Sequence, residues 1–368
     1  MTDLSSMLRV KSEIFRLFAS RSRKIVFTNE TKNSSVARMC NTFGMPEEIS
    51  NRSKLSLATE AAELYYVQGR KMETIGGYLN LSRSSVSRLL QMARDLGIIE
   101  FRIHSPSDLV QRLESEIHAK FGVTANVIPC PPEATSGERL DVVGQATAAK
   151  LGKFFRPGMT IGIAWGSTIS AVSRHMHSVA NSSSRIVQLN GAGNDHSSGL
   201  TYAGEILNQF AKSIGGLVVS FPVPAFFDNP ETKQAMWQER STSRVLEIQS
   251  RIDLAIFGLG RIDAEVPSQV YAAGYLDSKD LDDLRHQNVS GDIATVFYRP
   301  DGSTEGIPLN LRSSGPSLVQ LRKAPIRICV VSGRSKKAAL EGALAGGYIT
   351  DLYLDIQLAE SLLENSSV

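Results

Sequence analysis

Hydrophobic residues recur at helical spacing three times between residues 57 and 93, with polar residues between them. The first stripe holds Leu57, Ala61, Leu64 and Tyr65, the second Ile75 and Leu79, and the third Val86, Leu89, Leu90 and Ala93. The pattern predicts three short helices, the first beginning near Leu55. A short strand is expected to start within residues 97–99.

The segment between the second and third stripes has the residues of a tight turn between two helices. Asn80 tolerates the left-handed backbone conformation that ends a helix. Leu81 can fill the angle between the helices, and Ser82 is a good N-cap for the next one. Two helices that cross at such a turn form a helix-turn-helix, whose second helix can enter a DNA major groove.

Small polar and basic residues crowd the start of the third helix, opposite its hydrophobic stripe. They are Ser82, Arg83, Ser84, Ser85, Ser87 and Arg88. In a groove-reading helix such N-terminal residues contact phosphates and base edges, and Arg forks onto guanine. Alone, an Arg and Ser cluster is more often a solvated surface. Together with the stripes and the turn, it favours operator DNA as a partner.

A new helix is expected after the break at residues 104–107. It spans residues 107–121 and places Leu109, Leu113, Ile117 and Phe121 on one stripe. Such a stripe is typical of a connector that packs on the next domain, and equally of a helix between subunits. Both roles require the same pattern.

Strand and helix patterns alternate from residue 124 onward. Strands are expected at 124–128, 160–164, 185–189, 216–220, 252–257, 293–298, 326–331 and 350–354, and helices at 139–154, 168–179, from Leu200, 231–249, 336–345 and 356–364. The alternation predicts an α/β fold with a largely parallel sheet. The chain then divides into a weakly structured basic tail (1–54), a helix-turn-helix domain (55–104) and an effector and oligomerisation domain (105–368). The tail either adds nonspecific DNA affinity or has no role.

Glycine-rich or polar segments follow four of these strands, where ligands bind in open α/β sheets. Gly166, Ser167 and Thr168 come first, and a helix N-terminus of this kind favours an anion. Alone, so short a pattern is more often a simple N-cap. Gln188 and Asn190 belong to the second segment.

Gly258 and Gly260 form the third segment, which is not a dinucleotide fingerprint because the third glycine position falls at Asp263. The fourth segment, residues 332–337, brings hydroxyls and Lys336 to another helix start. Asp292 supplies a carboxylate that either accepts hydrogen bonds from sugar hydroxyls or belongs to a turn.

Charge is divided unevenly along the chain, although the net charge is only +3. Residues 1–104 hold 16 Lys and Arg against 10 Asp and Glu, whereas the remainder holds 24 against 27. A basic head on a mildly acidic body fits polyanion binding at one end, and the large acidic body disfavours a nonspecific DNA-compacting protein.

No other feature points to a membrane, a metal or a cofactor. The three cysteines are far apart and lack metal-ligand spacing, as in a reduced cytoplasmic protein. No apolar run approaches the roughly 20 residues of a membrane span, and no secretory signal is evident. His175 and His177 do not share a helix face.

Motifs over about residues 55–364 resemble the SorC family of bacterial transcriptional regulators, which includes sorbose-operon and deoxyribonucleoside regulators. They are LYYVQGRKMETIGGYLNLSRSSVSRLLQMARDLGIIEFRI, IGIAWGSTI, QLNGAG, FGLGRIDAEVPS, GDIATVFYRPDG and SKKAALEGALAGG. The resemblance implies an operator-binding head and an effector domain similar to sugar-phosphate isomerases and glucosamine-phosphate deaminases. It further implies a phosphorylated sugar or polyol effector and a homo-oligomer, commonly a tetramer.

The family's phosphate loop falls on Gly166, Ser167 and Thr168, its ligand-contacting carboxylate on Asp292 and its phosphate-side lysine on Lys336. Two departures stand out. The family's Gly-Gly before that lysine reads Gly333-Arg334, where Arg334 either adds a phosphate contact or fills part of the pocket. An Ala usual in the second helix is replaced within Gly76-Gly77, which should loosen that helix.

The sequence thus predicts a regulator of a carbohydrate or polyol catabolic operon, with no catalysis. The alternative is a sugar-phosphate isomerase or deaminase with an attached DNA-binding head. Such an enzyme needs a positioned general base, for which Asp263 and Asp292 are the candidates.

Overall fold

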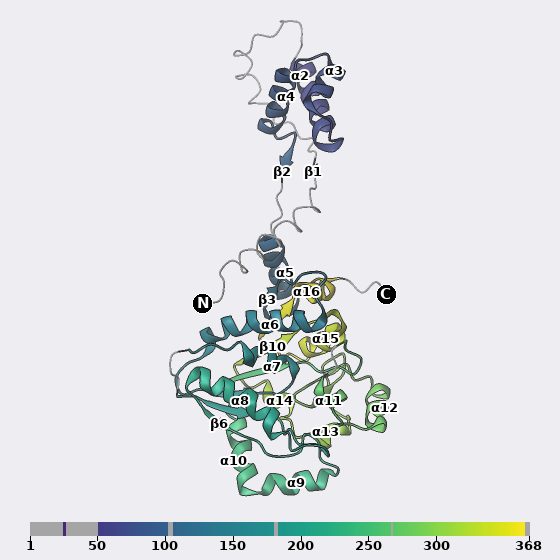
Figure 1. Cartoon of the computed structure of the whole chain (residues 1–368). Helices are drawn as coiled ribbons and strands as arrows, with labels where there is room; N and C mark the ends of the chain where they lie inside the picture. Colours follow the sequence, from purple (N-terminus) through teal and green to yellow (C-terminus); the bar gives the residue numbers. More distant parts are fainter. Residues whose placement is uncertain (1–24, 27–50, 102–105, 180–182, 266–267, 365–368) are drawn as a thin grey trace. The chain divides into compact units, whose positions relative to one another are not determined.

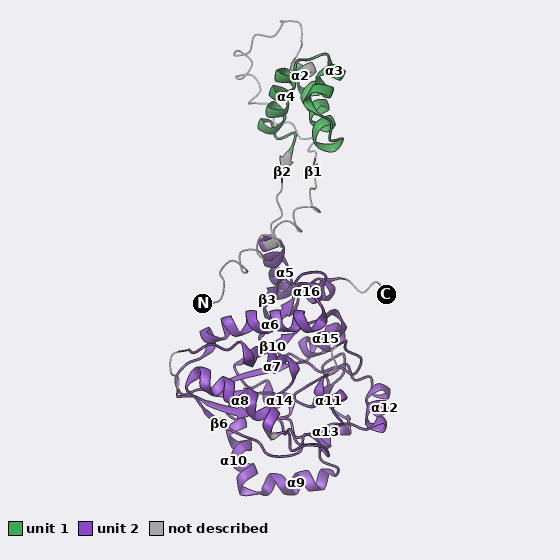
Figure 2. Cartoon of the chain, in the orientation of Figure 1, with its two compact units in different colours: residues 1–105 green, residues 106–368 purple. Residues whose placement is uncertain are grey.

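The computed structural model describes residues 25–26, 51–101, 106–179, 183–265 and 268–364. The chain forms two compact units, a head of residues 1–105 and a body of residues 106–368 (Figure 2). No helix among the described residues combines the length and the apolar character needed to cross a membrane.

The head is a bundle of short helices with a two-stranded ribbon. Its elements are α2 (Asn51–Ala62), the π-helical turn η2 (Glu63–Val67), α3 (Met72–Leu79), α4 (Arg83–Asp95), β1 (Ile25–Val26) and β2 (Glu100–Phe101), with β1 and β2 antiparallel. The three predicted stripes meet in one core of Ala58, Ala61, Ala62, Leu64, Ile75, Val86, Leu89, Leu90, Ala93 and Ile99. Burial of these stripes is what holds such short helices in place.

The turn between α3 and α4 has the predicted geometry. Asn80 adopts a left-handed conformation with φ of 52°, and Leu81 packs against the head core. The Ser82 hydroxyl accepts a hydrogen bond from the backbone N–H of Ser85 at 3.1 Å. Gly76 fits closely here, because a Cβ on it would lie 2.7 Å from the carbonyl oxygen of Leu81.

Two features of the head differ from the sequence expectation. Helix α2 begins at Asn51 rather than near Leu55. Strand β1 lies within the segment expected to be weakly structured, where it pairs with β2. The rest of that predicted tail, residues 1–24 and 27–50, lies outside the described residues.

The body is built on a seven-stranded sheet in which every neighbouring pair is parallel. Its order is β3-β11-β10-β7-β4-β5-β6. The strands are β3 (Thr124–Ile128), β4 (Thr160–Ile163), β5 (Arg185–Gln188), β6 (Leu217–Val219), β7 (Leu254–Gly258), β10 (Ile326–Val331) and β11 (Asp351–Asp355). Central strands such as β7 are buried on both faces, which explains their continuous apolar runs.

Helices cover both faces of this sheet (Figure 1). One core includes side chains of α5 (Pro106–Phe121), α10 (Arg240–Gln249), α15 (Lys337–Ala345) and α16 (Ile356–Leu363). The other includes side chains of α6 (Ser136–Leu151), α7 (Ser167–Arg174) and α8 (Leu200–Ile214). The remaining helical elements are η3 (Gly152–Phe154), α9 (Pro230–Gln238), α11 (Gln269–Ala272), α12 (Ser278–His286), α13 (Leu309–Arg312), α14 (Leu318–Leu321) and η4 (Arg334–Lys336).

The stripe predicted on residues 107–121 packs inside the body. Leu113 and Ile117 of α5 are buried in its core, and Leu109 and Phe121 pack at the edge of the same cluster. The stripe therefore has the contacts expected of a connector packed on the domain that follows it.

The strand expected at 293–298 is instead a hairpin of β8 (Gly291–Ile293) and β9 (Val296–Tyr298) outside the main sheet. Ala294 and Thr295 form its turn with φ of 47° and 68°. Because such turns usually contain Gly or Asn, the apolar run gave no sign of one.

Helix α7 ends at Arg174 rather than at 179. The His175 ring turns toward α6, where its Nε2 lies 3.0 Å from Asp141 Oδ1.

Candidate functional site

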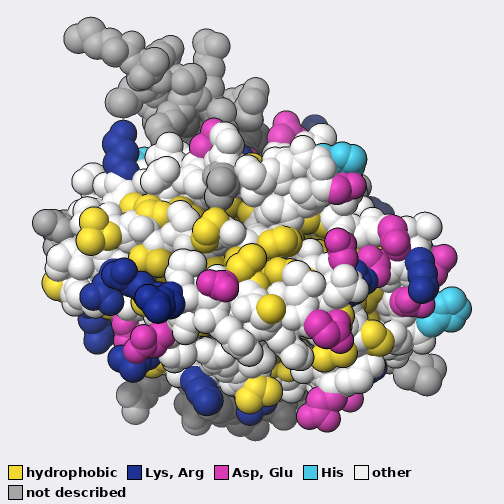
Figure 3. All heavy atoms as spheres, turned by 90° about the horizontal axis from the view of Figure 1, so that it is seen from below, with side chains coloured by type: hydrophobic (Ala, Val, Ile, Leu, Met, Phe, Trp, Pro, Cys, Tyr) yellow, Lys and Arg dark blue, Asp and Glu magenta, His cyan; other side chains and the backbone are white. Residues whose placement is uncertain are grey.

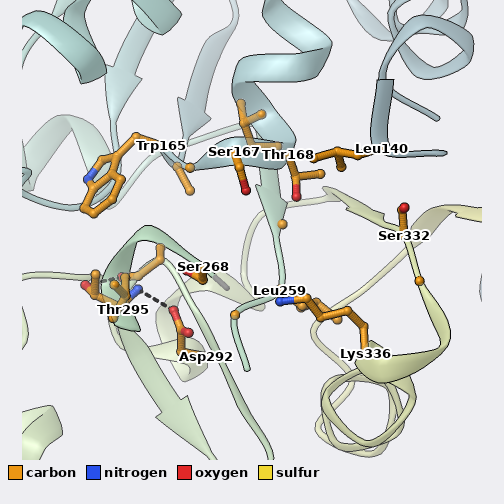
Figure 4. A pocket seen from close by; sticks show the side chains of 18 of the residues that line it. Leu140, Trp165, Ser167, Thr168, Leu259, Ser268, Asp292, Thr295, Ser332 and Lys336 are labelled. Carbon is orange, nitrogen blue, oxygen red and sulfur yellow. Dashed lines mark hydrogen bonds between the residues drawn. The ribbon is translucent and has the colours of Figure 1, made fainter. Parts of the chain in front are cut away.

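A pocket lies at the carboxyl ends of the central strands, where the order of the sheet reverses. From β4 the chain adds β5 and β6 on one side and then returns to place β7 on the other side of β4. Ligands of open α/β sheets bind at such a switch point. The pocket has about 730 Å³ of empty space, its solvent-open mouth included, and Figure 4 shows ten of its residues by name.

The start of α7 forms one wall of the pocket. Gly166 is its N-cap with φ of 146° and provides no side-chain cap, and the carbonyl of Gly166 accepts the first helical bond from Ser170 N–H at 2.8 Å. The N–H groups at the start of a helix lack partners within it. The backbone at Ser167 and Thr168, together with their half-buried hydroxyls, therefore presents donors and the positive end of the helix dipole to the pocket.

Lys336, at the end of η4, extends its side chain into the same pocket (Figure 4). It is 8% exposed, and none of the hydrogen bonds or ion pairs among the described residues neutralises its ammonium group. Burial lowers the pKa of Lys336 to about 8, although the charge of Asp292 raises it, and Arg261 lowers it further. A buried cation that only the nearby charge of Asp292 offsets, with no direct hydrogen bond or ion pair, attracts an anionic ligand.

Asp292, in β8, contributes a buried carboxylate. Its Oδ1 accepts a hydrogen bond from the Tyr271 hydroxyl at 2.8 Å, and its Oδ2 accepts one from Thr295 N–H at 3.2 Å. Burial raises the pKa of Asp292, while the hydrogen bond from Tyr271 and the charge of Lys336 lower it. Gly260 leaves room for this carboxylate, because a Cβ at residue 260 would lie 1.7 Å from Asp292 Oδ1.

Trp165 and Asn190 close another side of the pocket. The Trp165 indole Nε1–H donates to the carbonyl oxygens of Asn190 and Gly191 at 3.2 and 2.8 Å. Asn190 is 2% exposed, and its side-chain Oδ1 has no hydrogen-bond partner among the residues that the structure describes. This amide oxygen is thus an acceptor that a ligand hydroxyl could satisfy.

The fold brings together eight of the nine residues predicted for the effector site. They are Gly166, Ser167, Thr168, Asn190, Gly258, Gly260, Asp292 and Lys336. Gln188 is not among the lining residues. Its Nε2 donates to the Asn190 carbonyl and its Oε1 accepts from Phe221 N–H, so both ends of this buried amide are occupied by the fold.

Two further residues lie away from the pocket. The Asp263 carboxylate is 72% exposed and is 3.9 Å from Arg285, so it is not placed to act as a base in the pocket. The Arg334 guanidinium is 3.8 Å from the Glu360 carboxylate and is not among the residues that line the pocket in this structure.

Several lining residues had no sequence signal. Leu140 comes from α6, and Thr295 comes from the unexpected hairpin. Trp165 directly precedes the predicted segment Gly166–Thr168. Its place in the pocket wall, however, depends on its hydrogen bond to Asn190, which follows a different strand. Among the described residues no group of three or more His, Cys, Asp or Glu is arranged to hold a metal ion.

The predicted DNA-reading residues share the start of α4. Ser82, Arg83, Ser84, Ser87 and Arg88 are exposed, and Ser85 is half-buried. Arg83 is held by Glu73 of α3, with Nε 3.0 Å from Oε1. The exposed face is therefore polar and basic, while Val86, Leu89 and Leu90 turn inward.

Comparison with known proteins agrees with this architecture. Residues 106–364 match a family described as a putative sugar-binding domain. The deoxyribonucleoside regulator of Bacillus subtilis is 30% identical over 316 residues, which cover 86% of this chain and 99% of that protein.

Solved structures extend the likeness to both units. A domain of a possible sugar-binding transcriptional regulator from Arthrobacter aurescens TC1 is 49% identical, with a TM-score of 0.66 over 70% of this chain and 99% of that domain. The full-length sorbitol operon regulator SorC from Klebsiella pneumoniae is 25% identical, with a TM-score of 0.65 over 84% of this chain and 99% of that one. The relatives are transcriptional regulators, and the chain belongs to the SorC family of sugar-binding transcriptional regulators.

Proposed function

We propose that this regulator controls a carbohydrate or polyol catabolic operon in response to a phosphorylated sugar or polyol. The observation that carries the proposal is the pairing of two anion-attracting features in one pocket. The uncapped start of α7 provides backbone donors, and the buried ammonium of Lys336, which forms no ion pair among the described residues, extends into the same space. A phosphate group satisfies both at once.

The rest of the pocket suits the hydroxyl groups of the same effector. The Asp292 carboxylate and the unsatisfied Oδ1 of Asn190 are acceptors, and sugar and polyol hydroxyls are donors. The ring of Trp165 adds an apolar surface beside them. An effector with an anionic end and several hydroxyls fits this set of groups better than a purely apolar ligand does.

The head binds operator DNA in this proposal, through the exposed start of α4. One helix-turn-helix reads only a few base pairs, so we expect a homo-oligomer, with a tetramer favoured by the family, that presents several heads. Figure 3 shows hydrophobic side chains that reach the surface in a band across one face of the molecule, which supports an oligomer. A regulator that binds operator DNA acts in the cytoplasm.

A thermal-shift screen of the full chain tests the effector class. The phosphorylated probes are ribose 5-phosphate, fructose 6-phosphate and sorbitol 6-phosphate, with the unphosphorylated compounds and inorganic phosphate as matched controls. A ligand that binds only the folded state stabilises it by about 2.7 kcal/mol at 100 times its Kd. A larger shift with an unphosphorylated compound than with its phosphate would contradict the proposal.

The effector leaves the pocket unchanged in this proposal. The enzyme alternative requires a general base, and Asp292 is the buried carboxylate of the pocket, with both its oxygens engaged. A carboxylate so placed holds hydroxyls without needing to transfer protons. NMR of the stabilising probe incubated with the protein tests this point. Isomerised product from ribose 5-phosphate or fructose 6-phosphate that disappears with Asp292→Asn would favour the enzyme.

A further inference from the structure

The loop that carries Lys336 is also hydrogen-bonded to the start of α16, the last helix of the body. The backbone N–H of Gly333 donates to Asp355 Oδ2 at 2.6 Å. The other oxygen of this carboxylate, Oδ1, accepts from Leu358 N–H at 3.0 Å and so caps α16. Asp355 is fully buried. One carboxylate therefore joins a pocket segment to the start of a helix.

A second contact joins the same two elements at the surface. The guanidinium of Arg334 in η4 lies 3.8 Å from the Glu360 carboxylate in α16. Both side chains are partly exposed, so this contact is weak compared with the buried one. It nevertheless gives Arg334 a place outside the pocket, between the effector loop and α16.

Helix α16 is packed in turn against α5, and Figure 1 shows the two side by side. Leu358 and Leu362 of α16 share a buried cluster with Leu113 and Ile117 of α5. The Lys120 ammonium donates to the Leu362 carbonyl at 3.4 Å. In the chain, α5 is the first element of the body and follows the DNA-binding head directly.

We infer that Asp355 is a positioning residue that couples occupancy of the effector pocket to α16 and, through α16, to α5. The inference rests on the proposed function, because it takes an anionic effector to bind beside Gly333 and Lys336. A buried carboxylate cannot lose a donor without leaving an unsatisfied charge. A shift of the Gly333 backbone on effector binding therefore carries Asp355 and the start of α16 with it.

Two substitutions separate the two tasks of Asp355. Asp355→Ser keeps a side-chain oxygen suited to cap α16 but lacks a second oxygen for Gly333 N–H. Asp355→Ala removes both. The matched control is Asp277→Ser, because Asp277 also caps a helix, accepting from Asp280 N–H at 2.7 Å, and makes no comparable contact to the effector loop.

Hydrogen exchange of the full chain, with and without ribose 5-phosphate, fructose 6-phosphate or sorbitol 6-phosphate, provides the measurement. In the unsubstituted protein and in Asp277→Ser, a bound probe should slow exchange at the start of α7 and also in α16 and α5. In Asp355→Ser, the slowing at α7 should persist while the slowing in α16 and α5 falls at least threefold. Equal slowing in α16 and α5 with and without the Asp355 carboxylate overturns the inference.

Arg334→Ala gives a second measurement that does not depend on a buried substitution. Arg334→Ala should partly reduce the slowing of exchange in α16 and leave the slowing at the start of α7 intact. Unchanged slowing in α16 in both Arg334→Ala and Asp355→Ser would count against coupling by this route. Failure of the proposed effector class gives a different result. If no phosphorylated probe slows exchange at the start of α7 in the unsubstituted protein, the proposed effector class is wrong, and the coupling proposed for it falls as well.

Discussion

The head and the body both use basic side chains, but in opposite environments. In the head, Arg83 is 72% exposed and pairs with an exposed Glu73, whereas Lys336 of the body is 8% exposed and has no ion-pair partner among the described residues. A surface charge costs little and is screened by salt. A buried unpaired charge is costly until a ligand neutralises it.

The difference fits the two kinds of ligand proposed here. A DNA duplex is a long polyanion, which many weak surface contacts can hold. A small phosphorylated effector offers few atoms, so each contact must be strong, and strong contacts require exclusion of water. The head therefore displays its charge, while the body buries a cation in a pocket.

Loss of the buried cation should have the largest effect. Lys336→Ala is expected to weaken binding of the stabilising probe by about 1.5–3 kcal/mol, or roughly 10- to 150-fold, because a charge-assisted hydrogen bond is lost. Isothermal titration measures the change. The neighbouring Lys337→Ala is the matched control, since Lys337 instead lies near Glu341 at 3.8 Å. Equal affinities of the two variants would remove Lys336 from the site.

In the head, Arg88→Ala should cost about 1–3 kcal/mol in operator affinity if its guanidinium reads one guanine. The loss should be concentrated at a single base position, whereas loss of a phosphate contact would weaken all sequences alike. Binding to operator variants at matched salt distinguishes these outcomes. Arg251→Ala, on the surface of the body, should leave DNA affinity unchanged.

The titration of Lys336 should make effector affinity depend on pH in the alkaline range. Its pKa is lowered from 10.5 to about 8, so probe affinity should be nearly flat near pH 7, begin to fall as the pH approaches 8, and fall up to tenfold per unit above it. A phosphate monoester is already largely a dianion there, with a second pKa near 6.

Protein stability should respond in the opposite direction, because the unfolded chain binds the proton more tightly. The contribution of Lys336 to the free energy of unfolding therefore rises between pH 8 and 10.5. Comparison with Lys336→Met isolates both effects. Parallel pH profiles for the two proteins would mean that Lys336 does not titrate in this range.

The smallest predicted effects concern two adjacent glycines of the head. A Cβ at Gly77 would meet nothing within 4 Å, whereas a Cβ at Gly76 would lie 2.7 Å from the Leu81 carbonyl oxygen. Gly77→Ala should stabilise the head by up to about 1 kcal/mol, and Gly76→Ala should destabilise it. Hydrogen exchange of the head amides reports both changes. Stabilisation by both substitutions would contradict the close packing of the turn.

The head was predictable from sequence because its signals are local. The turn needs only Asn80, Leu81 and Ser82 in succession, and the three stripes repeat within a few residues of one another. Its two-stranded ribbon was not predictable, because β1 and β2 pair across more than seventy residues of chain.

The pocket was predictable only where its residues follow strands in a parallel sheet. Gly166, Gly258 and Lys336 were found in this way. Gln188 met the same criterion, yet its amide is occupied by the backbone of neighbouring segments. The hairpin turn at Ala294 and Thr295 has a backbone conformation that tertiary contacts impose, so no local pattern indicated it.

The order of the sheet also bears on how the chain folds during synthesis. Strand β3 is the first strand of the body, but its partner in the sheet is β11, the last. Residues up to β11 must therefore be synthesised before β3 and β11 can pair, whereas the helices of the head leave the ribosome much earlier. Contacts so distant in sequence slow folding. Premature termination before residue 351 would thus release a head attached to an unfinished body, and such products should be prone to degradation.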